Sequence, residues 1–136
     1  MKKLILIFLV AISFSMVAKA ASSISEQTLR AAIMLKNSGA YAEAIELYKK
    51  AAALGNGAAA NSLGVLYYKD DEVKRDLDES IKWFKKAADL GEPLAEKNLK
   101  EAQNLKIFID SLDDLHKPSL IAVSYTHLTL PTNREV

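Results

Sequence analysis

The chain has 136 residues, half of them apolar, with 18 basic and 17 acidic side chains and a formal net charge of +1. This length suffices for one folded domain and is short for two. The near balance of charge argues against nucleic acid as a partner. Because the chain has no cysteine, its stability must come from packing without disulfides.

The first twenty residues have the layout of a secretory signal peptide. Two lysines precede an uncharged apolar run over residues 4–17, and small residues then occupy the two positions that a signal peptidase reads. We therefore expect residues 1–20 to be a signal peptide cleaved between Ala20 and Ala21, giving a periplasmic or secreted protein without membrane contact. An uncleaved membrane anchor is the alternative, but the run is shorter than the roughly 20 apolar residues that a span needs.

Five helices are predicted after this segment. In chain order their expected ranges are 25–39, 42–55, 57–69, 78–91 and 93–112. The second and fourth are copies of one unit, because a shift of 36 positions superposes AEAIELYKKAAALG on DESIKWFKKAADLG with shared Glu, Lys, Ala and Gly residues. Helical periodicity alone does not explain shared polar residues, so the pattern predicts an internal repeat.

Glycines and apolar spacing indicate how these helices pack. Gly55 and Gly91 each end a copy, at the position of a left-handed C-terminal cap. Gly64 lies inside the helix expected over 57–69, where glycine costs about 0.5 to 1 kcal/mol relative to alanine. We therefore expect a neighbouring helix to pass close to Gly64, with Tyr67 filling the space beside it. The buried stripe predicted in the second copy is Leu77, Ile81, Phe84 and Ala88.

The alternating helices predict an all-α fold. We expect a short α-solenoid of antiparallel helix pairs over residues 21–117, with about two repeats plus a C-terminal helix, because stacked pairs bury faces that a single pair leaves exposed. A four-helix bundle is the alternative, but it does not account for a 36-residue period with polar identities. Pro93 is expected in the first turn of the last helix.

The stretch from Leu63 to Gly91 resembles the Sel1-like repeat, a relative of the tetratricopeptide repeat with a longer loop between its two helices. The matching positions are Leu63, Gly64, Tyr67, Val73, Asp76, Trp83, Phe84, Lys86, Ala87, Ala88 and Gly91. The resemblance implies structural roles for all of them except Val73 and Lys86. Asp70 and Glu72 stand where the family usually has glycine, which predicts a looser loop. The chain also lacks the cysteine pairs of the disulfide-stapled secreted branch of this family.

No set of side chains predicts catalysis or cofactor binding. The two histidines, His116 and His127, lie outside the repeat, and without cysteine they make no expected zinc or copper site. Acidic residues gather between positions 70 and 79, but their spacing does not follow the calcium-loop pattern. We interpret them as a solvated loop and a helix start, and expect a non-enzymatic protein that binds no metal and no other cofactor.

Candidate partner-binding residues lie on the helix expected over 57–69. Asn61, Val65 and Tyr68 are spaced by four and three on the helix type that lines the concave face in the resembled repeats. Asn can bond a peptide backbone, and Tyr offers contact area with a polar tip; ordinary surface is the competing interpretation. Four aromatic residues are expected in the core rather than in a peptide pocket: Tyr48, Tyr67, Trp83 and Phe84.

These patterns predict a non-catalytic scaffold for protein–protein interaction in the bacterial cell envelope, with a protein or peptide partner on the concave face. A cell-envelope or β-lactam hydrolase, suggested for cysteine-containing relatives, is an alternative for which the sequence supplies no catalytic set. A truncated fragment of a longer repeat protein is a third possibility. The identity of the partner and the oligomeric state stay open.

The last residues, 118–136, differ in composition from the helices before them, and we expect them to be unstructured. VSYTHLTLPT, residues 123–132, is similar to the translation of a transposon-end adapter used to prepare DNA libraries. Successive adapter codons match this whole stretch in one frame. We therefore interpret it as artefactual and exclude Tyr125 and His127 from the functional candidates. A β-prone edge strand is the alternative interpretation.

Overall fold

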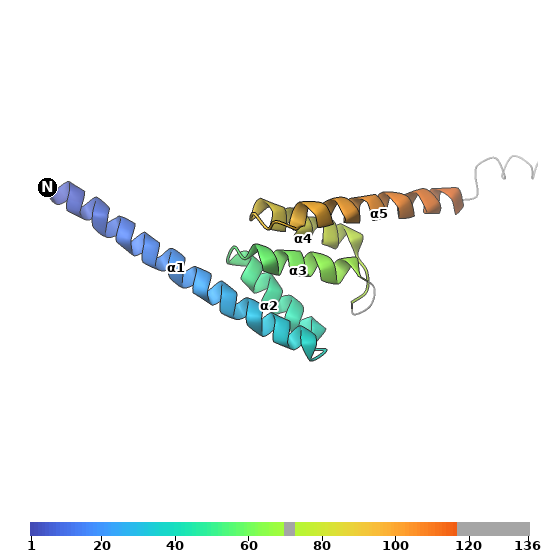
Figure 1. Cartoon of the computed structure of the whole chain (residues 1–136), viewed down its shortest axis with the longest axis horizontal. Coiled ribbons are helices and arrows are strands. Elements are labelled where there is room, and N and C mark those ends of the chain that lie inside the picture. The colour runs from blue at the N-terminus through green and yellow to red at the C-terminus, as the bar shows by residue number, and fades with distance from the viewer. Residues whose placement is uncertain (70–72, 117–136) are drawn as a thin grey trace, which may run out of the picture. The chain divides into compact units, whose positions relative to one another are not determined.

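The computed structural model describes residues 1–69 and 73–116, which form five α-helices and, within those ranges, no β-strand. The helices are α1 Lys2–Asn37, α2 Tyr41–Ala53, α3 Gly57–Tyr68, α4 Leu77–Asp89 and α5 Ala95–His116 (Figure 1). The predicted all-α repeat fold is confirmed. The acidic residues 70–72 and the tail 118–136, including the adapter-like stretch 123–132, lie outside the described residues.

The chain divides into two compact units, Met1–Gln103 and Asn104–Val136. The first unit contains α1 to α4 and the beginning of α5. The described part of the second unit is the remainder of α5, in which Ile107, Phe108 and Leu115 are exposed. All the candidate binding residues belong to the first unit.

Three helices end in the same backbone motif. The glycines that follow α1, α2 and α4 are Gly39, Gly55 and Gly91, with positive φ angles of 83°, 89° and 79°, a conformation that glycine adopts without steric cost. The residue after each glycine donates its N–H to the carbonyl oxygen of the residue five positions earlier. Asn56, for example, donates to the Ala51 carbonyl oxygen at 3.1 Å. This Schellman motif satisfies carbonyls that a helix end would leave open. The caps predicted at Gly55 and Gly91 are therefore confirmed.

Two helices begin at a side-chain cap. At the start of α3, Asn56 Oδ1 accepts from the N–H of Ala59 at 3.0 Å, and at the start of α4, Asp76 Oδ1 accepts from the N–H of Glu79 at 3.0 Å. Such a cap is worth about 1 kcal/mol. The N–H of Asp76 also donates to the Tyr67 carbonyl oxygen at 2.9 Å, so the end of the loop is tied back to α3.

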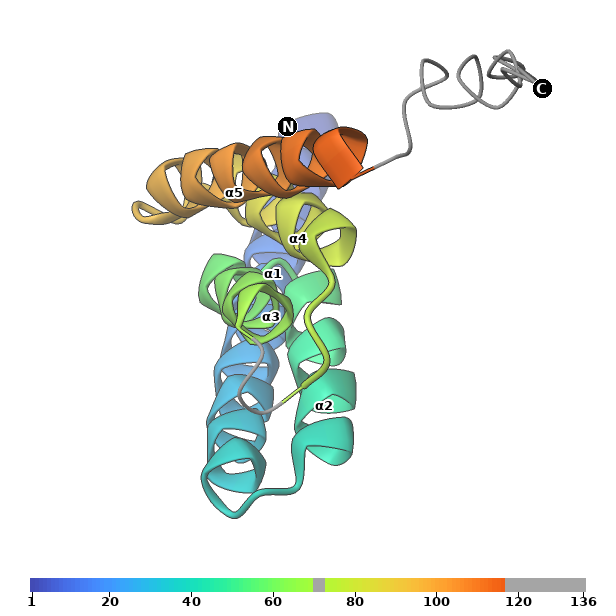
Figure 2. The same cartoon turned by 90° about the vertical axis from the view of Figure 1, so that its right-hand side faces the viewer.

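Consecutive helices pack in chain order, α1 against α2, α2 against α3, and α3 against α4. Figure 2 shows α3 lying between α2 and α4. Many of the buried core residues are alanines. The distance between two helix axes depends on the side chains at their contact, so helix faces rich in alanine can pack closely. The larger buried side chains are Tyr48, Leu63, Leu66 and Phe84.

The buried faces of α2 and α4 are equivalent under the 36-residue shift. Their most buried residues are Ala44, Tyr48 and Ala51 in α2, and Ser80, Phe84 and Ala87 in α4. The buried stripe predicted in α4 is therefore correct at Phe84. Its other members, Leu77, Ile81 and Ala88, lie at the edge of the buried face and are only half-buried. The centre of the face consists of small residues, which a search for large apolar side chains passes over.

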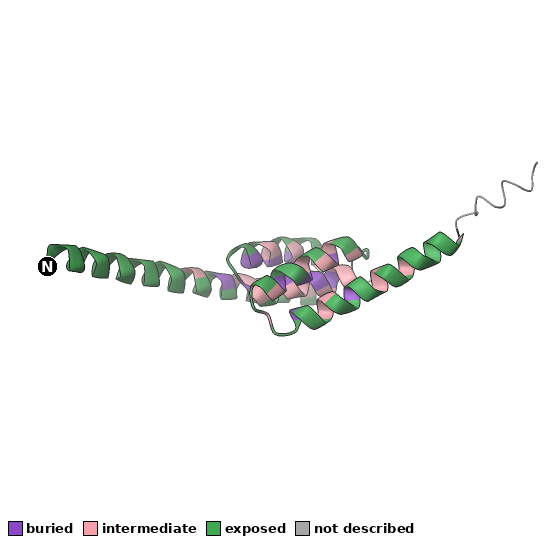
Figure 3. Cartoon of the chain, turned by 90° about the horizontal axis from the view of Figure 1, so that it is seen from above, coloured by how far each residue is buried: buried purple, intermediate pink, exposed green. Residues whose placement is uncertain are grey.

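Helix α1 is longer than the predicted helix. It runs without a break from Lys2, through the expected signal peptide, to Asn37. Figure 3 shows that its N-terminal half is exposed. Among the described helices, it is long and apolar enough to cross a membrane, a criterion that a signal sequence near the N-terminus also meets.

Helix α5 begins later than predicted. Pro93 lies in a separate turn, in which the Ala95 N–H donates to the Glu92 carbonyl oxygen at 3.1 Å, and the helix starts at Ala95. The expectation that Pro93 occupies the first helical turn is wrong. The reason is that Glu92 already completes the Schellman motif of α4, with its N–H on the Ala87 carbonyl oxygen at 3.0 Å, and a connecting turn must follow.

Candidate functional site

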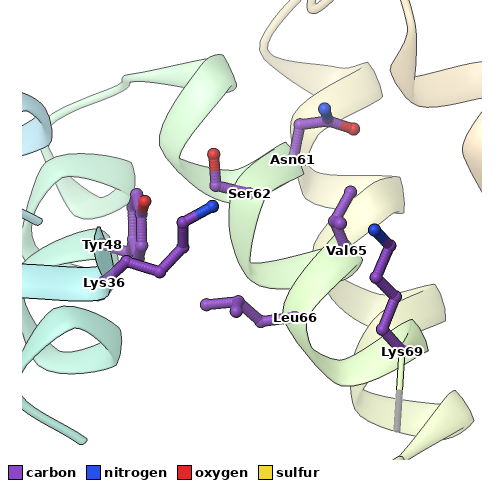
Figure 4. Close-up of a pocket in the computed structure, with 7 residues that line it drawn as sticks. All are labelled: Lys36, Tyr48, Asn61, Ser62, Val65, Leu66 and Lys69. Atoms are coloured by element: carbon purple, nitrogen blue, oxygen red, sulfur yellow. The ribbon is translucent and has the colours of Figure 1, made fainter. Parts of the chain in front are cut away.

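Two adjoining hollows lie along α3. The first, of about 160 Å³, is lined by Lys36, Tyr48, Asn61, Ser62, Val65, Leu66 and Lys69 (Figure 4). The second, of about 170 Å³, is lined by Val65, Tyr68, Lys69, Phe84, Asn98 and Glu101. Because the two hollows share Val65 and Lys69, we treat them together as the α3 groove.

The three residues predicted for partner binding all line this groove. Asn61 borders the first hollow, Tyr68 borders the second, and Val65 borders both. All three are half-buried, so each has surface left to offer. Their spacing of four and three places them on one face of α3. The structure thus brings them together, and contact with a partner stays a prediction.

Asn61 is engaged within the chain. Its Oδ1 accepts a 2.8 Å hydrogen bond from Nδ2 of Asn98, at the start of α5. No sequence pattern indicated this pairing, because the two residues lie on different helices. A partner that bonds the Asn61 oxygen must share or displace Asn98, so the net gain from that contact is small. Val65 and Tyr68 therefore offer the more accessible contacts.

The aromatic residues belong to the core, as expected. Tyr48 and Phe84 are 1% and 2% exposed, while Tyr67 and Trp83 are half-buried against the core. The indole nitrogen of Trp83 donates to Glu79 Oε2 at 3.1 Å, and Lys86 Nζ lies 5.5 Å from the ring centroid, a cation–π geometry. Trp83 lines neither hollow.

Helix α4 makes the close approach that was expected at Gly64. A β-carbon at position 64 would lie 2.8 Å from Phe84 Cγ, closer than packed carbon atoms approach one another. The hydroxyl of the fully buried Ser80 donates to the Gly64 carbonyl oxygen at 2.8 Å. The ring beside Gly64 is therefore that of Phe84, and the expectation that Tyr67 fills this space is wrong.

The resemblance marked five further residues as structural, and these lie in the core, in a cap or in a turn: Leu63, Asp76, Ala87, Ala88 and Gly91. Leu63 and Ala87 are fully buried and Ala88 is half-buried. Asp76 caps α4, and Gly91 ends it with a positive φ.

Sequence reasoning missed the charged residues of the groove. Lys36 comes from the last turn of α1, Lys69 follows α3, and Glu101 comes from α5. These three residues lie far apart in the sequence, and no spacing pattern links them. Only the fold reveals that they share a groove. Glu101 Oε1 lies 3.9 Å from Lys97 Nζ. Among the described residues, no group of three or more Asp, Glu or His side chains is arranged to hold a metal ion.

Comparison with known protein families identifies the repeat. The Sel1 repeat family matches residues 36–56 and residues 57–92. Residues 36–92 are Sel1 repeats. The two matched segments meet at the start of α3, so one Sel1 repeat contains α3, the following loop and α4, and the other contains α2. No curated protein and no solved structure has a significant match to the chain.

Sel1 repeats mediate protein–protein interaction and are typically non-catalytic scaffolds. The Sel1 repeat at 57–92 supplies α3, and with it most residues of the α3 groove. The family therefore supports a protein partner for this chain.

Proposed function

We propose that the protein is a non-catalytic scaffold of the bacterial cell envelope that holds a segment of a partner protein in the α3 groove. The observation that carries this proposal is the position of Asn61, Val65 and Tyr68, which line two adjoining hollows on a Sel1 repeat. A segment lying along α3 would contact all three.

The groove suits a modest interaction. Val65 and Tyr68 supply apolar contact area, and tyrosine is enriched among the residues that dominate binding energy at protein interfaces. The groove runs along a single helix of 12 residues. A standard protein–protein interface uses about 20 to 30 residues from each partner, so the contact area here is small. We therefore expect a dissociation constant on the order of micromolar or weaker.

The envelope location is the second part of the proposal. The exposed, apolar first half of α1 has the composition of a signal sequence. Only the export of residues 21 onward would place the groove in the periplasm or outside the cell.

Alanine substitution in the groove tests the proposal. We compare Tyr68→Ala, and Tyr68→Ala combined with Asn61→Ala, with the parent chain in affinity capture from a cell-envelope extract. Loss of a buried tyrosine contact should lower partner capture on the order of tenfold. Quantitative mass spectrometry of the captured proteins measures the change.

A matched variant controls for non-specific effects. Lys85→Ala alters an exposed residue of α4 that lines neither hollow, and should leave capture unchanged. Circular dichroism establishes that each variant stays folded. Undiminished capture by a folded Tyr68→Ala protein would rule out the groove as the binding surface.

A further inference from the structure

We infer that the α3 groove selects a partner segment in which an acidic side chain lies next to an apolar one, the carboxylate entering the first hollow and the apolar side chain entering the second. This inference rests on the proposed function of the groove. It adds the chemistry of the partner, which comes from the unequal distribution of charge between the two hollows.

Among the described residues that line the first hollow, the only charged groups are positive. Among its lining residues the ionisable groups are the ammonium groups of Lys36 and Lys69 and the phenol of Tyr48. Figure 4 shows the Lys36 chain extending from α1 toward Ser62, and the Lys69 amino group beside Val65. Ion pairs between residues that the structure describes involve neither lysine. An anion in this hollow would therefore meet two cations, one from the last turn of α1 and one from the residue that follows α3.

The size and floor of the first hollow suit a carboxylate side chain. Its volume of about 160 Å³ equals roughly five times the share of one water molecule in the liquid. Tyr48 and Leu66 are almost fully buried and close its inner side, so a carboxylate loses part of its hydration on entry. Two ammonium groups offset that loss through charge-assisted hydrogen bonds, which a neutral amide cannot form.

The second hollow has the opposite preference. Val65, Tyr68 and Phe84 give it an apolar lining that favours burial of an apolar side chain. Its one carboxylate is that of Glu101, which at 3.9 Å makes only a long contact with Lys97. The other charged group of this hollow is the ammonium of Lys69, which it shares with the first hollow, so the two charges balance and an acidic side chain gains no net attraction there. The two hollows therefore define an order along α3, acidic toward α1 and apolar toward α5.

Synthetic peptides test this selectivity directly. The probes are fluorescein-labelled nine-residue peptides of Gly and Ser with one Glu and one Leu separated by zero to four positions. Capping both ends leaves the Glu side chain as the only carboxylate of the peptide itself, and because every probe carries the same label, the comparison of Glu with Gln isolates this carboxylate. Matched peptides carry Gln for Glu, or Ser for Leu. Fluorescence anisotropy measures their binding to the full chain in a non-ionic detergent at roughly 50 mM salt, where exposed charges are weakly screened.

We expect at least one Glu–Leu spacing to bind, and both replacement peptides to bind more weakly. The advantage of Glu over Gln should shrink in about 1 M salt, because screening weakens the contribution of the lysines. Lys36→Gln and Lys69→Gln should each lower the affinity for the Glu peptide about two- to fivefold, the range for partly exposed charge pairs. Neither substitution should change the affinity for the Gln peptide.

Two further variants sharpen the test. Lys50→Gln removes an exposed lysine of α2 that lines neither hollow, and should leave every affinity unchanged. Lys36→Glu leaves one positive and one negative group in the first hollow, so the net charge there is cancelled and the preference for Glu over Gln should be lost.

The inference is overturned if Glu and Gln peptides bind the parent chain equally, or if Lys50→Gln weakens binding as much as Lys36→Gln does. Equal binding that Tyr68→Ala abolishes would retain the groove and remove its acid selectivity. Absence of binding at every spacing would also contradict the inference. The capture experiment on the natural partner would then decide the proposed function separately.

Discussion

At the scale of single residues, the junction of α3 and α4 depends on Gly64. The Phe84 ring occupies the space that any larger residue at position 64 would need, and Ser80 bonds the Gly64 carbonyl oxygen. A glycine within a helix costs about 0.5 to 1 kcal/mol relative to alanine. Burial of a phenylalanine side chain contributes about 1.5 to 3 kcal/mol, so the packing gain outweighs the cost of glycine.

Gly64→Ala should therefore destabilise the protein, although alanine has the higher helix propensity. The new methyl group collides with a buried ring that has little room to move, and such overpacking costs about 1 to 3 kcal/mol. Urea unfolding followed by circular dichroism measures the change in the free energy of unfolding. A more stable Gly64→Ala protein would show that Phe84 does not constrain this position.

A double-mutant cycle separates this contact from other causes. In a Phe84→Ala background the ring and its Cγ are absent, and the penalty of Gly64→Ala should fall by about 1 kcal/mol or more, because residues in direct contact couple by 0.5 to 3 kcal/mol. Equal penalties in the two backgrounds would mean that the collision lies elsewhere.

The sequence predicted some of these residue roles and not others. It indicated that a helix passes close to Gly64, because a glycine inside a helix is unfavourable without a packing reason. It did not identify Ser80, whose equivalent in the first copy is Ala44, because a small polar residue does not register in an apolar pattern. It also missed the bond between Asn61 and Asn98, which depends on two side chains from different helices.

At the scale of helices, local signals placed most of the ends correctly. Gly55 and Gly91 adopt the expected left-handed conformation, since each helix end needs its carbonyls satisfied and only glycine does this without steric cost. The start of α5 was misplaced, because Pro93 fits a connecting turn as well as a first helical turn. Helix α1 continues from Lys2 because nothing between the apolar run and Asn37 breaks a helix, as neither proline nor glycine occurs there.

This continuity bears on the predicted cleavage. Residues 18–20 lie within α1 and are exposed, with burial beginning at Ala21 and Ser25. Because these residues are exposed, little packing opposes local opening of the helix at the cleavage position. We expect the protein exported by a bacterial host to begin at Ala21, and intact-mass measurement checks this. A product that keeps Met1 and stays in the membrane fraction would contradict it.

At the scale of the whole molecule, the 36-residue period was the decisive sequence signal. Shared polar residues revealed the repeat, the repeat implied stacked helix pairs, and the Sel1 match over residues 36–92 agrees. The charge distribution of the groove could not be predicted, because Lys36, Lys69 and Glu101 meet only after stacking. What the sequence did provide was the helix that lines the groove and three of its residues.

Site-specific photo-crosslinking in living cells tests most directly the central claim that the α3 groove holds a partner protein. A photoreactive benzoyl-phenylalanine is placed at Tyr68 in the groove, or at Lys85 on the exposed face of α4. We expect a discrete covalent adduct with another protein at position 68 and none at position 85. An adduct at position 85 with none at position 68 would contradict it.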